Sequence, residues 1–101
     1  YTTSKAGIIG LTKALAVSYA EQGIRVNCIC PGWVDTPMNQ RLAEEVGGMD
    51  KLIPIIKKQQ PLPRMISTRE IGYSVLFLAS DEASAITGHA LYVDGAASAA
   101  I

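Results

Sequence analysis

Residues 24–36 read IRVNCICPGWVDT, a β-rich run that ends at a proline and a glycine. Branched apolar side chains favour strands, and a Pro-Gly pair marks a turn that ends one. We therefore predict a short buried strand over residues 24–30. The loop that follows, residues 31–36, would leave the carboxyl end of this strand, where parallel α/β sheets bind ligands.

A long helix is predicted before the strand, over residues 1–22. Apolar and small residues recur there at helical spacing, and Gly23 follows as a stop signal. Ala6, Gly7 and Gly10 would allow close approach of a ligand or of another backbone, and ordinary helix packing is the alternative explanation. The order so far is helix, tight turn and strand.

Glycine and proline divide the middle of the chain into two predicted short helices, residues 38–46 and 50–60. Gly47-Gly48 separates them, and Pro61-Leu62-Pro63 ends the second. This punctuation is typical of a mobile cover over a binding site.

A further helix and a second strand follow. Ser67 and Glu70 have the spacing of a capping box, which predicts a helix from there to about Ser80. The segment 80–82 is expected to cap one more turn, and the apolar run 89–93 predicts a second buried strand. Two strands separated by helices imply a parallel pair, which needs further strands and two covered faces. We expect part of a larger fold, with exposed apolar faces and an aggregated or molten state in isolation.

Composition limits the classes of function. With 101 residues, 49% of them hydrophobic and 18% charged, the chain is one globular domain or part of one. Nine basic and nine acidic residues cancel, which argues against nucleic acid as a partner. Apolar runs are far shorter than the ~20 residues that cross a bilayer, so no membrane association is expected. Cys28 and Cys30 suit neither a disulfide nor a metal site and indicate a reducing, cytoplasmic location.

Tyr1 and Lys5 are four residues apart, so a helix stacks a phenol and an ammonium on one face. A phenol titrates near pH ~10 in water, too high for efficient proton exchange at neutral pH. A nearby ammonium would stabilise the phenolate by on the order of 3 kcal/mol at an effective dielectric constant of ~20. Tyr1 is therefore a candidate general acid/base. The alternative is a chain-end tyrosine beside a solvated lysine.

The loop after the first strand carries groups that could bind a carboxamide. Pro31 stiffens the loop and Gly32 permits close approach. The main-chain groups around Val34 and the Thr36 hydroxyl offer hydrogen-bond donors and acceptors. The alternative is that Pro31 and Gly32 only turn the chain.

Several motifs occur together and in order: Tyr1-x-x-x-Lys5, Ala6-Gly7, Arg25-Val26-Asn27, Pro31-Gly32-x-Val34-x-Thr36 and Gly88-x-x-x-x-Val93-Asp94-Gly95. With these motifs the chain resembles the C-terminal half of a short-chain dehydrogenase/reductase. The resemblance implies a Rossmann-like, doubly wound parallel α/β sheet, with residues 1–101 forming the C-terminal portion of one NAD(P)-binding domain.

The resemblance implies an oxidoreductase that uses NAD or NADP to interconvert a secondary alcohol and a ketone. Tyr1 would exchange a proton with the substrate beside the nicotinamide, and Lys5 would stabilise its phenolate and bind the nicotinamide ribose. Hydride transfer would take place at a carbon close to Tyr1.

The same resemblance assigns the loop to the cofactor. Val34 and Thr36 would hold the nicotinamide carboxamide, while Pro31 and Gly32 would pack beside the ring.

Residues 36–66 match the variable substrate-binding segment of the family. Trp33 and Met38 are weak candidates for lining its pocket, as are Met49 and Ile53, and apolar packing is an equally good explanation. Arg64 resembles a structural arginine of the family, preceded here by a proline.

The resemblance leaves a second function open. The glycine-rich phosphate turn, the catalytic serine and the assisting asparagine would lie upstream of Tyr1, so we expect a front half that is absent from this sequence. The alternative to an enzyme is a truncated, non-catalytic product or an oligomerisation module. A homodimer or homotetramer is implied in either case, and neither the substrate nor the choice of NAD or NADP can be assigned.

Overall fold

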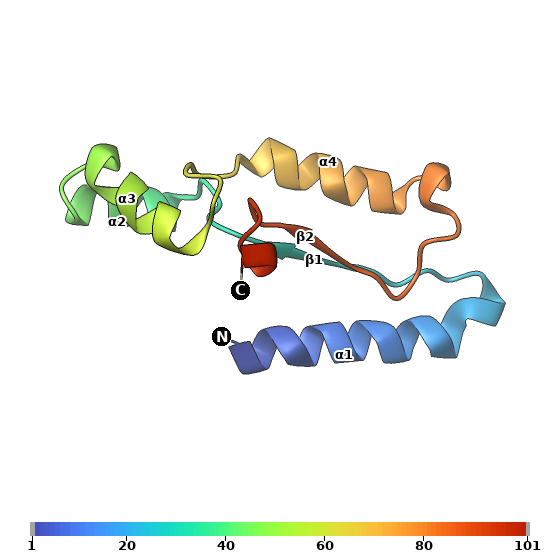
Figure 1. Ribbon diagram of the computed structural model, residues 1–101. Helices are drawn as coiled ribbons and strands as arrows, with labels where there is room; N and C mark the ends of the chain where they lie inside the picture. Colours follow the sequence, from blue (N-terminus) through green and yellow to red (C-terminus); the bar gives the residue numbers. More distant parts are fainter. Residues whose placement is uncertain (1, 101) are drawn as a thin grey trace. The chain divides into compact units, whose positions relative to one another are not determined.

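The structure is a computed structural model that describes residues 2–100. Its two strands pair in one sheet. The Cys28 N–H donates to the His89 carbonyl, and four residues later the Gly32 N–H donates to the Val93 carbonyl. Both partners advance in the same direction along the chain, so the strands are parallel. The predicted α/β class is confirmed. The elements are α1 (Thr2–Tyr19), η1 (Ala20–Gln22), β1 (Cys28–Pro31), α2 (Pro37–Glu45), α3 (Met49–Gln59), α4 (Thr68–Ala79), η2 (Asp81–Ala83), β2 (Ala90–Val93) and η3 (Ser98–Ala100), shown in Figure 1.

The chain divides into two compact units. The first unit comprises Tyr1–Cys30 with Tyr73–Leu91, and the second comprises Pro31–Gly72 with Tyr92–Ile101. Among the described residues, no helix is both long and apolar enough to cross a membrane.

In the first unit, α1 lies on one side of the strand residues and the last part of α4 lies on the other (Figure 1). Thr12 and Ala16 are the buried residues of the α1 face, at 6% and 3% exposure. Most of the apolar surface of the helix is open, with Leu11 59% and Val17 82% exposed. An open apolar helix face of this kind is a surface that a further packing partner can cover.

The end of α1 follows the predicted stop signal. The helix tightens into the 3-10 turn η1, and Gly23 adopts φ 76° and donates its N–H to the Ala20 carbonyl. A left-handed residue is easily adopted by glycine because it has no Cβ.

The first strand is shorter at its start than predicted. Residues 24–27 lie outside β1 because other groups use their hydrogen-bonding capacity. The Val26 N–H donates to Thr87 Oγ1 at 3.1 Å. Asn27 donates through Nδ2 to the Ile86 carbonyl and accepts through Oδ1 from the His89 N–H, each at 3.0 Å. Asn27 therefore fastens the entry of β1 to the turn that leads into β2.

Arg25 ties the same region to the end of α4. Its guanidinium donates to the Leu78 carbonyl at 2.7 Å and to the Ser80 and Ile86 carbonyls at 3.2 Å each. Leu78 and Ser80 stand at the C-terminus of α4, where carbonyl groups lack helical partners and the helix dipole favours a cation. Arg25 thus caps a helix more than fifty residues away in the sequence.

In the second unit, α2 and α3 pack on a small core of their own. Ala43, Leu52 and Ile56 form it. Both helices lie within one residue of their predicted bounds, and Gly47 and Gly48 between them have φ angles of 107° and 116°. Positive φ angles are costly for other residues, which explains the break. Trp33, Leu42, Val46 and Met65 are partly buried around this core.

The predicted capping box at the start of α4 is confirmed. The Glu70 N–H donates to Ser67 Oγ at 3.0 Å, and the Ser67 N–H donates to Glu70 Oε1 at 2.9 Å. The predicted turn after α4 is present as η2, but Ser80 does not cap it with its side chain. Its hydroxyl instead donates back to the Phe77 carbonyl at 2.6 Å.

The C-terminal tail contains the short helix η3. Asp94, 6% exposed, accepts the Ser98 N–H at 3.0 Å through its carboxylate and so holds this turn. Ala96, next to Gly95, adopts φ 73°, in the left-handed region that favours glycine.

Candidate functional site

The loop that leaves β1 is held by main-chain hydrogen bonds on two sides. The Gly32 N–H donates to the Val93 carbonyl at 3.0 Å, which continues the pairing with β2. The Ile66 N–H donates to the Trp33 carbonyl at 2.6 Å, and the Asp35 N–H donates to the Ile66 carbonyl at 2.8 Å. Val34 and Ile66 therefore form a parallel bridge.

This bridge determines where the polar groups of Val34 point. The Trp33 carbonyl and the Val34 N–H belong to one planar trans peptide, so they point in opposite directions. Because the carbonyl faces Ile66, the Val34 N–H faces away from it, and no described residue accepts a hydrogen bond from it. The Val34 carbonyl accepts Asn39 Nδ2 at 2.7 Å. Val34 thus offers one oriented donor.

Thr36 adds a hydroxyl two residues further on. It is the N-cap of α2, with extended φ and ψ of −124° and 161°, and its Oγ1 accepts the Asn39 N–H at 3.3 Å. A second lone pair of Oγ1 remains available to a ligand, because the cap uses only one. An oriented N–H donor and a hydroxyl acceptor match the carbonyl and the amino group of a carboxamide, respectively.

Gly32 is required by packing inside the second unit. A Cβ built on Gly32 would overlap Gln60 Oε1 and would lie 2.9 Å from Asp94 Cα. Close approach of a ligand was the predicted reason for this glycine and stays a prediction. Pro31, half-buried, is the last residue of β1 and precedes it directly.

Gln60 takes part in this loop and was missed from the sequence. It is fully buried, with 0% exposure. Its Oε1 accepts the Trp33 N–H at 2.9 Å, and its Nε2 donates to the Leu62 and Arg64 carbonyls at 2.9 and 2.8 Å. No motif marks such a residue, because all three partners are main-chain atoms that any sequence possesses.

The candidate pocket residues differ in exposure. Trp33 packs against the core of the second unit and donates Nε1 to Gln59 Oε1 at 3.1 Å, so its contacts in this unit are those of a packed side chain. Met38 is 67% exposed, Met49 41% and Ile53 37%. Their role in a pocket stays a prediction.

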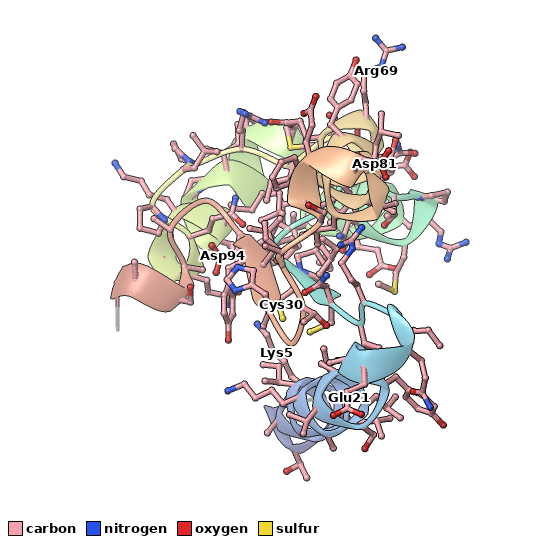
Figure 2. All side chains as sticks on the ribbon, turned by 90° about the vertical axis from the view of Figure 1, so that its right-hand side faces the viewer. Lys5, Glu21, Cys30, Arg69, Asp81 and Asp94 are labelled. Atoms are coloured by element: carbon pink, nitrogen blue, oxygen red, sulfur yellow. The ribbon has the colours of Figure 1, made fainter. Side chains whose placement is uncertain are left out.

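Lys5 of the candidate proton-transfer pair belongs to the first unit, whereas Tyr1 lies outside the described residues. Lys5 is half-buried on α1, and in Figure 2 it leaves the helix on the side that faces Cys30 of β1. Cys30 is buried and Cys28 is half-buried, and no disulfide joins them to each other or to another described residue.

An ion pair fastens the end of the 36–66 segment to α4. Arg64 bonds Glu70 through both guanidinium nitrogens, at 2.9 and 3.0 Å. Hydrogen bonding from Arg64, then from the Ser67 N–H, lowers the pKa of Glu70 from 4.5 to about 2. The same hydrogen bond raises the pKa of Arg64. Glu70 therefore stays ionised at neutral pH and serves structure.

Among residues 2–100, no group of three or more histidine, cysteine or acidic side chains is arranged to hold a metal ion.

The chain is similar to known proteins over almost its whole length. The profile of a family described as Enoyl-(Acyl carrier protein) reductase matches residues 1–98. Dehydrogenase/reductase SDR family member 6 of Aquarana catesbeiana is 44% identical over 95 residues, covering 94% of this chain and 39% of that protein. Oxidoreductase UcpA of Salmonella typhimurium is 47% identical over 97 residues, covering 94% of this chain and 37% of that protein.

Solved structures show the same arrangement of elements. A 4-hydroxyisoleucine dehydrogenase complexed with NADH has a TM-score of 0.83 at 37% identity, covering 98% of this chain and 39% of the other. Ligand-free aldohexose dehydrogenase of Thermoplasma acidophilum has a TM-score of 0.84 at 41% identity, covering 98% and 40%. Actinorhodin polyketide ketoreductase with NADPH has a TM-score of 0.82 at 35% identity, covering 96% and 39%. The chain spans less than half the length of each of these proteins.

Proposed function

This chain belongs to the short-chain dehydrogenase/reductase family, and we propose that it is the C-terminal part of an NAD(P)-dependent oxidoreductase that interconverts a secondary alcohol and a ketone. The observation that carries the proposal is the oriented Val34 N–H, two residues before the Thr36 hydroxyl, in the loop that leaves a parallel strand. The solved relatives with NADH and NADPH support the choice of cofactor class.

The loop fits the carboxamide of a nicotinamide dinucleotide. The Val34 N–H has no acceptor among the described residues, so a carboxamide oxygen would satisfy it. The Thr36 hydroxyl oxygen can accept a hydrogen bond from the carboxamide amino group with its second lone pair while still capping α2. When bound, the nicotinamide supplies or accepts the hydride. Pro31 and Gly32 would pack beside its ring.

Tyr1 is proposed to transfer the proton, and Lys5 is proposed to assist it. Oxidation of an alcohol to a ketone releases a hydride and a proton, and the Tyr1 phenolate would take the proton from the hydroxyl. In the reverse direction the phenol would return it to the ketone oxygen. Lys5, one helical turn along, would stabilise the phenolate and hold the nicotinamide ribose.

The substrate is proposed to be a small molecule that meets residues 36–66. The residues proposed to line its pocket are Trp33 and Met38, with Met49 and Ile53. Residues 36–66 contain no cluster of basic side chains that would be specific for a phosphate or carboxylate. Sugars, polyols, steroid-like rings and 3-oxoacyl thioesters all contain the required group. A cytoplasmic location agrees with two cysteines that form no disulfide among the described residues.

The test is Tyr1→Phe in the full-length protein that carries this segment. Loss of the proton donor should lower turnover by ~10²-fold or more, while the dissociation constant of the cofactor stays within about threefold. Tyr19→Phe is the matched control, because Tyr19 is a 42% exposed tyrosine at the end of α1, and it should leave both quantities unchanged. Unchanged turnover in Tyr1→Phe would remove the catalytic assignment.

A non-catalytic oligomerisation module is the alternative, and the open apolar face of α1 favours it. Leu11 and Val17 are 59% and 82% exposed, which suits burial against a second copy in a homodimer or homotetramer. Sedimentation of the full-length protein and of its Val17→Glu variant tests this role. If the chain is a non-catalytic module, Val17→Glu should dissociate the oligomer and the wild type should bind no cofactor. If the chain is part of an enzyme, the wild type should bind the cofactor.

A further inference from the structure

We propose that Gln60 is a positioning residue for the loop 31–36, holding the Val34 N–H in the orientation that binds the nicotinamide carboxamide. The inference rests on the proposed function. Its basis is a side chain with 0% exposure whose amide makes three hydrogen bonds, all to the main chain of the loop and of the segment that follows α3.

The orientation of Val34 depends on the backbone of Trp33. The Trp33 N–H lies in the peptide plane shared with Gly32, and Gln60 Oε1 holds it at 2.9 Å. The Trp33 carbonyl lies in the next plane, shared with Val34, and the Ile66 N–H holds it at 2.6 Å. Fixing both planes fixes the two torsion angles of Trp33 between them. The Val34 N–H is therefore directed by one main-chain bond and one side-chain bond.

The amide of Gln60 can adopt only one orientation. The Trp33 N–H requires an acceptor, and the Leu62 and Arg64 carbonyls require donors, so Oε1 must face Trp33 and Nε2 must face the carbonyls. Each of the three hydrogen bonds of the buried amide is made to a defined main-chain group. A residue without this amide would leave the Trp33 N–H and the Arg64 carbonyl without these partners, whereas the Leu62 carbonyl would still accept the Arg64 N–H at 2.9 Å.

Two glycines shape the space around this side chain. A Cβ on Gly32 would overlap Gln60 Oε1, and a Cβ on Gly95 would lie 2.8 Å from Gln60 Cγ and 2.7 Å from Leu62 Cβ. Gly95 also has φ 57°, which favours glycine independently. The Gln60 side chain is thus confined from the strand-exit side and from the side of the C-terminal turn.

Gln60 also joins the loop to the far end of the substrate segment. Through Leu62 and Arg64 it bonds the turn that leads from α3 to α4, and Arg64 in turn pairs with Glu70 at the start of α4. The same amide therefore connects the proposed carboxamide site with the boundary of residues 36–66.

The test compares Gln60→Met with Gln59→Met in the full-length protein. Methionine keeps the approximate size of glutamine but has no amide. Gln59 is exposed and bonds the indole of Trp33, whereas Gln60 bonds the Trp33 main chain, so the control removes a contact to the same residue without touching the loop backbone. The dissociation constants of NAD(P)H and of ADP-ribose, which lacks nicotinamide, are measured for each variant.

Gln60→Met should weaken NAD(P)H about tenfold and leave ADP-ribose within about twofold, because only the nicotinamide end meets the loop. Gln59→Met should change neither constant. A general structural defect would weaken both ligands together and would overturn the inference, as would unchanged NAD(P)H binding in Gln60→Met. A wild type that binds ADP-ribose as tightly as NAD(P)H would instead contradict the proposed nicotinamide site.

Amide hydrogen exchange of the wild type decides the matter if Gln60→Met fails to fold. The Trp33 N–H should be protected without any ligand, because Gln60 binds it, and the Val34 N–H should gain protection only with NAD(P)H. Trp33 exchange at the rate of an open loop amide would overturn the role of Gln60.

Discussion

Replacing Arg25 with methionine should destabilise the protein, because Arg25 caps the C-terminus of α4 from the entry of β1. Methionine retains much of the apolar stem and removes every donor. The guanidinium bonds the Leu78 carbonyl at 2.7 Å and the Ser80 and Ile86 carbonyls at 3.2 Å. A hydrogen bond from a charged donor contributes about 1.5 kcal/mol or more at good geometry, and we assign about half of that to each longer bond.

The three bonds together are worth about 3 kcal/mol, and the favourable position at the negative end of the helix dipole adds about 0.5 kcal/mol. Arg25 is only half-buried, so water would replace part of what the carbonyls lose. We therefore expect Arg25→Met to lower the free energy of unfolding by about 2 kcal/mol. Arg25→Lys should recover about half of this loss, because a single ammonium cannot reach carbonyls on two segments with the fork of a guanidinium.

Urea unfolding of the full-length protein, followed by circular dichroism, measures these changes. Arg41→Met is the matched control, because Arg41 is exposed on α2, and it should stay within about 0.5 kcal/mol of the wild type. Hydrogen exchange should also show earlier opening of the last turn of α4 in Arg25→Met. A loss no larger than that of the control would show that the carbonyls at the end of α4 do not depend on Arg25.

Three further outcomes are expected. The pKa of Glu70 is lowered from 4.5 to about 2, so its pairing with Arg64 stabilises the fold fully above about pH 4.5 and is lost as the pH falls toward 2. The difference in melting temperature between wild type and Glu70→Gln should therefore shrink as the pH falls over that range. A constant difference would contradict the assignment. Ala96→Gly should raise the free energy of unfolding by about 1 kcal/mol, because alanine at φ 73° carries a left-handed strain that glycine lacks, and a decrease in a urea titration would refute it. Residues 1–101 expressed alone should melt without cooperativity in calorimetry, because α1 leaves apolar side chains such as Val17 open, and a sharp cooperative transition would overturn this expectation.

The sequence was sufficient for the features that depend on neighbouring residues. Ser67 and Glu70 predicted the start of α4, because a capping box joins residues three apart. Gly23 predicted the end of the first helical segment, because the left-handed cap needs only the local chain. The loop after β1 was identified for the same reason, since proline and glycine end a strand wherever it lies.

The entry of β1 shows where local signals fail. Residues 24–27 have strand-like side chains, yet their polar groups bond the turn 86–89 in place of a strand ladder. Nothing near Asn27 in the sequence identifies its partners, which are about sixty residues away.

Only the tertiary structure could show what Arg25, Gly32 and Gln60 do. Arg25 and Gln60 bond carbonyl and N–H groups that every residue possesses, so their partners leave no mark in the sequence. Gly32 is required because a Cβ at this position would overlap the Gln60 amide and crowd the main chain of Asp94, and these groups come close only when the strands pair. Side-chain period and turn chemistry are local and can be read in order along the chain, whereas main-chain acceptors become specific partners only through the position that folding gives them.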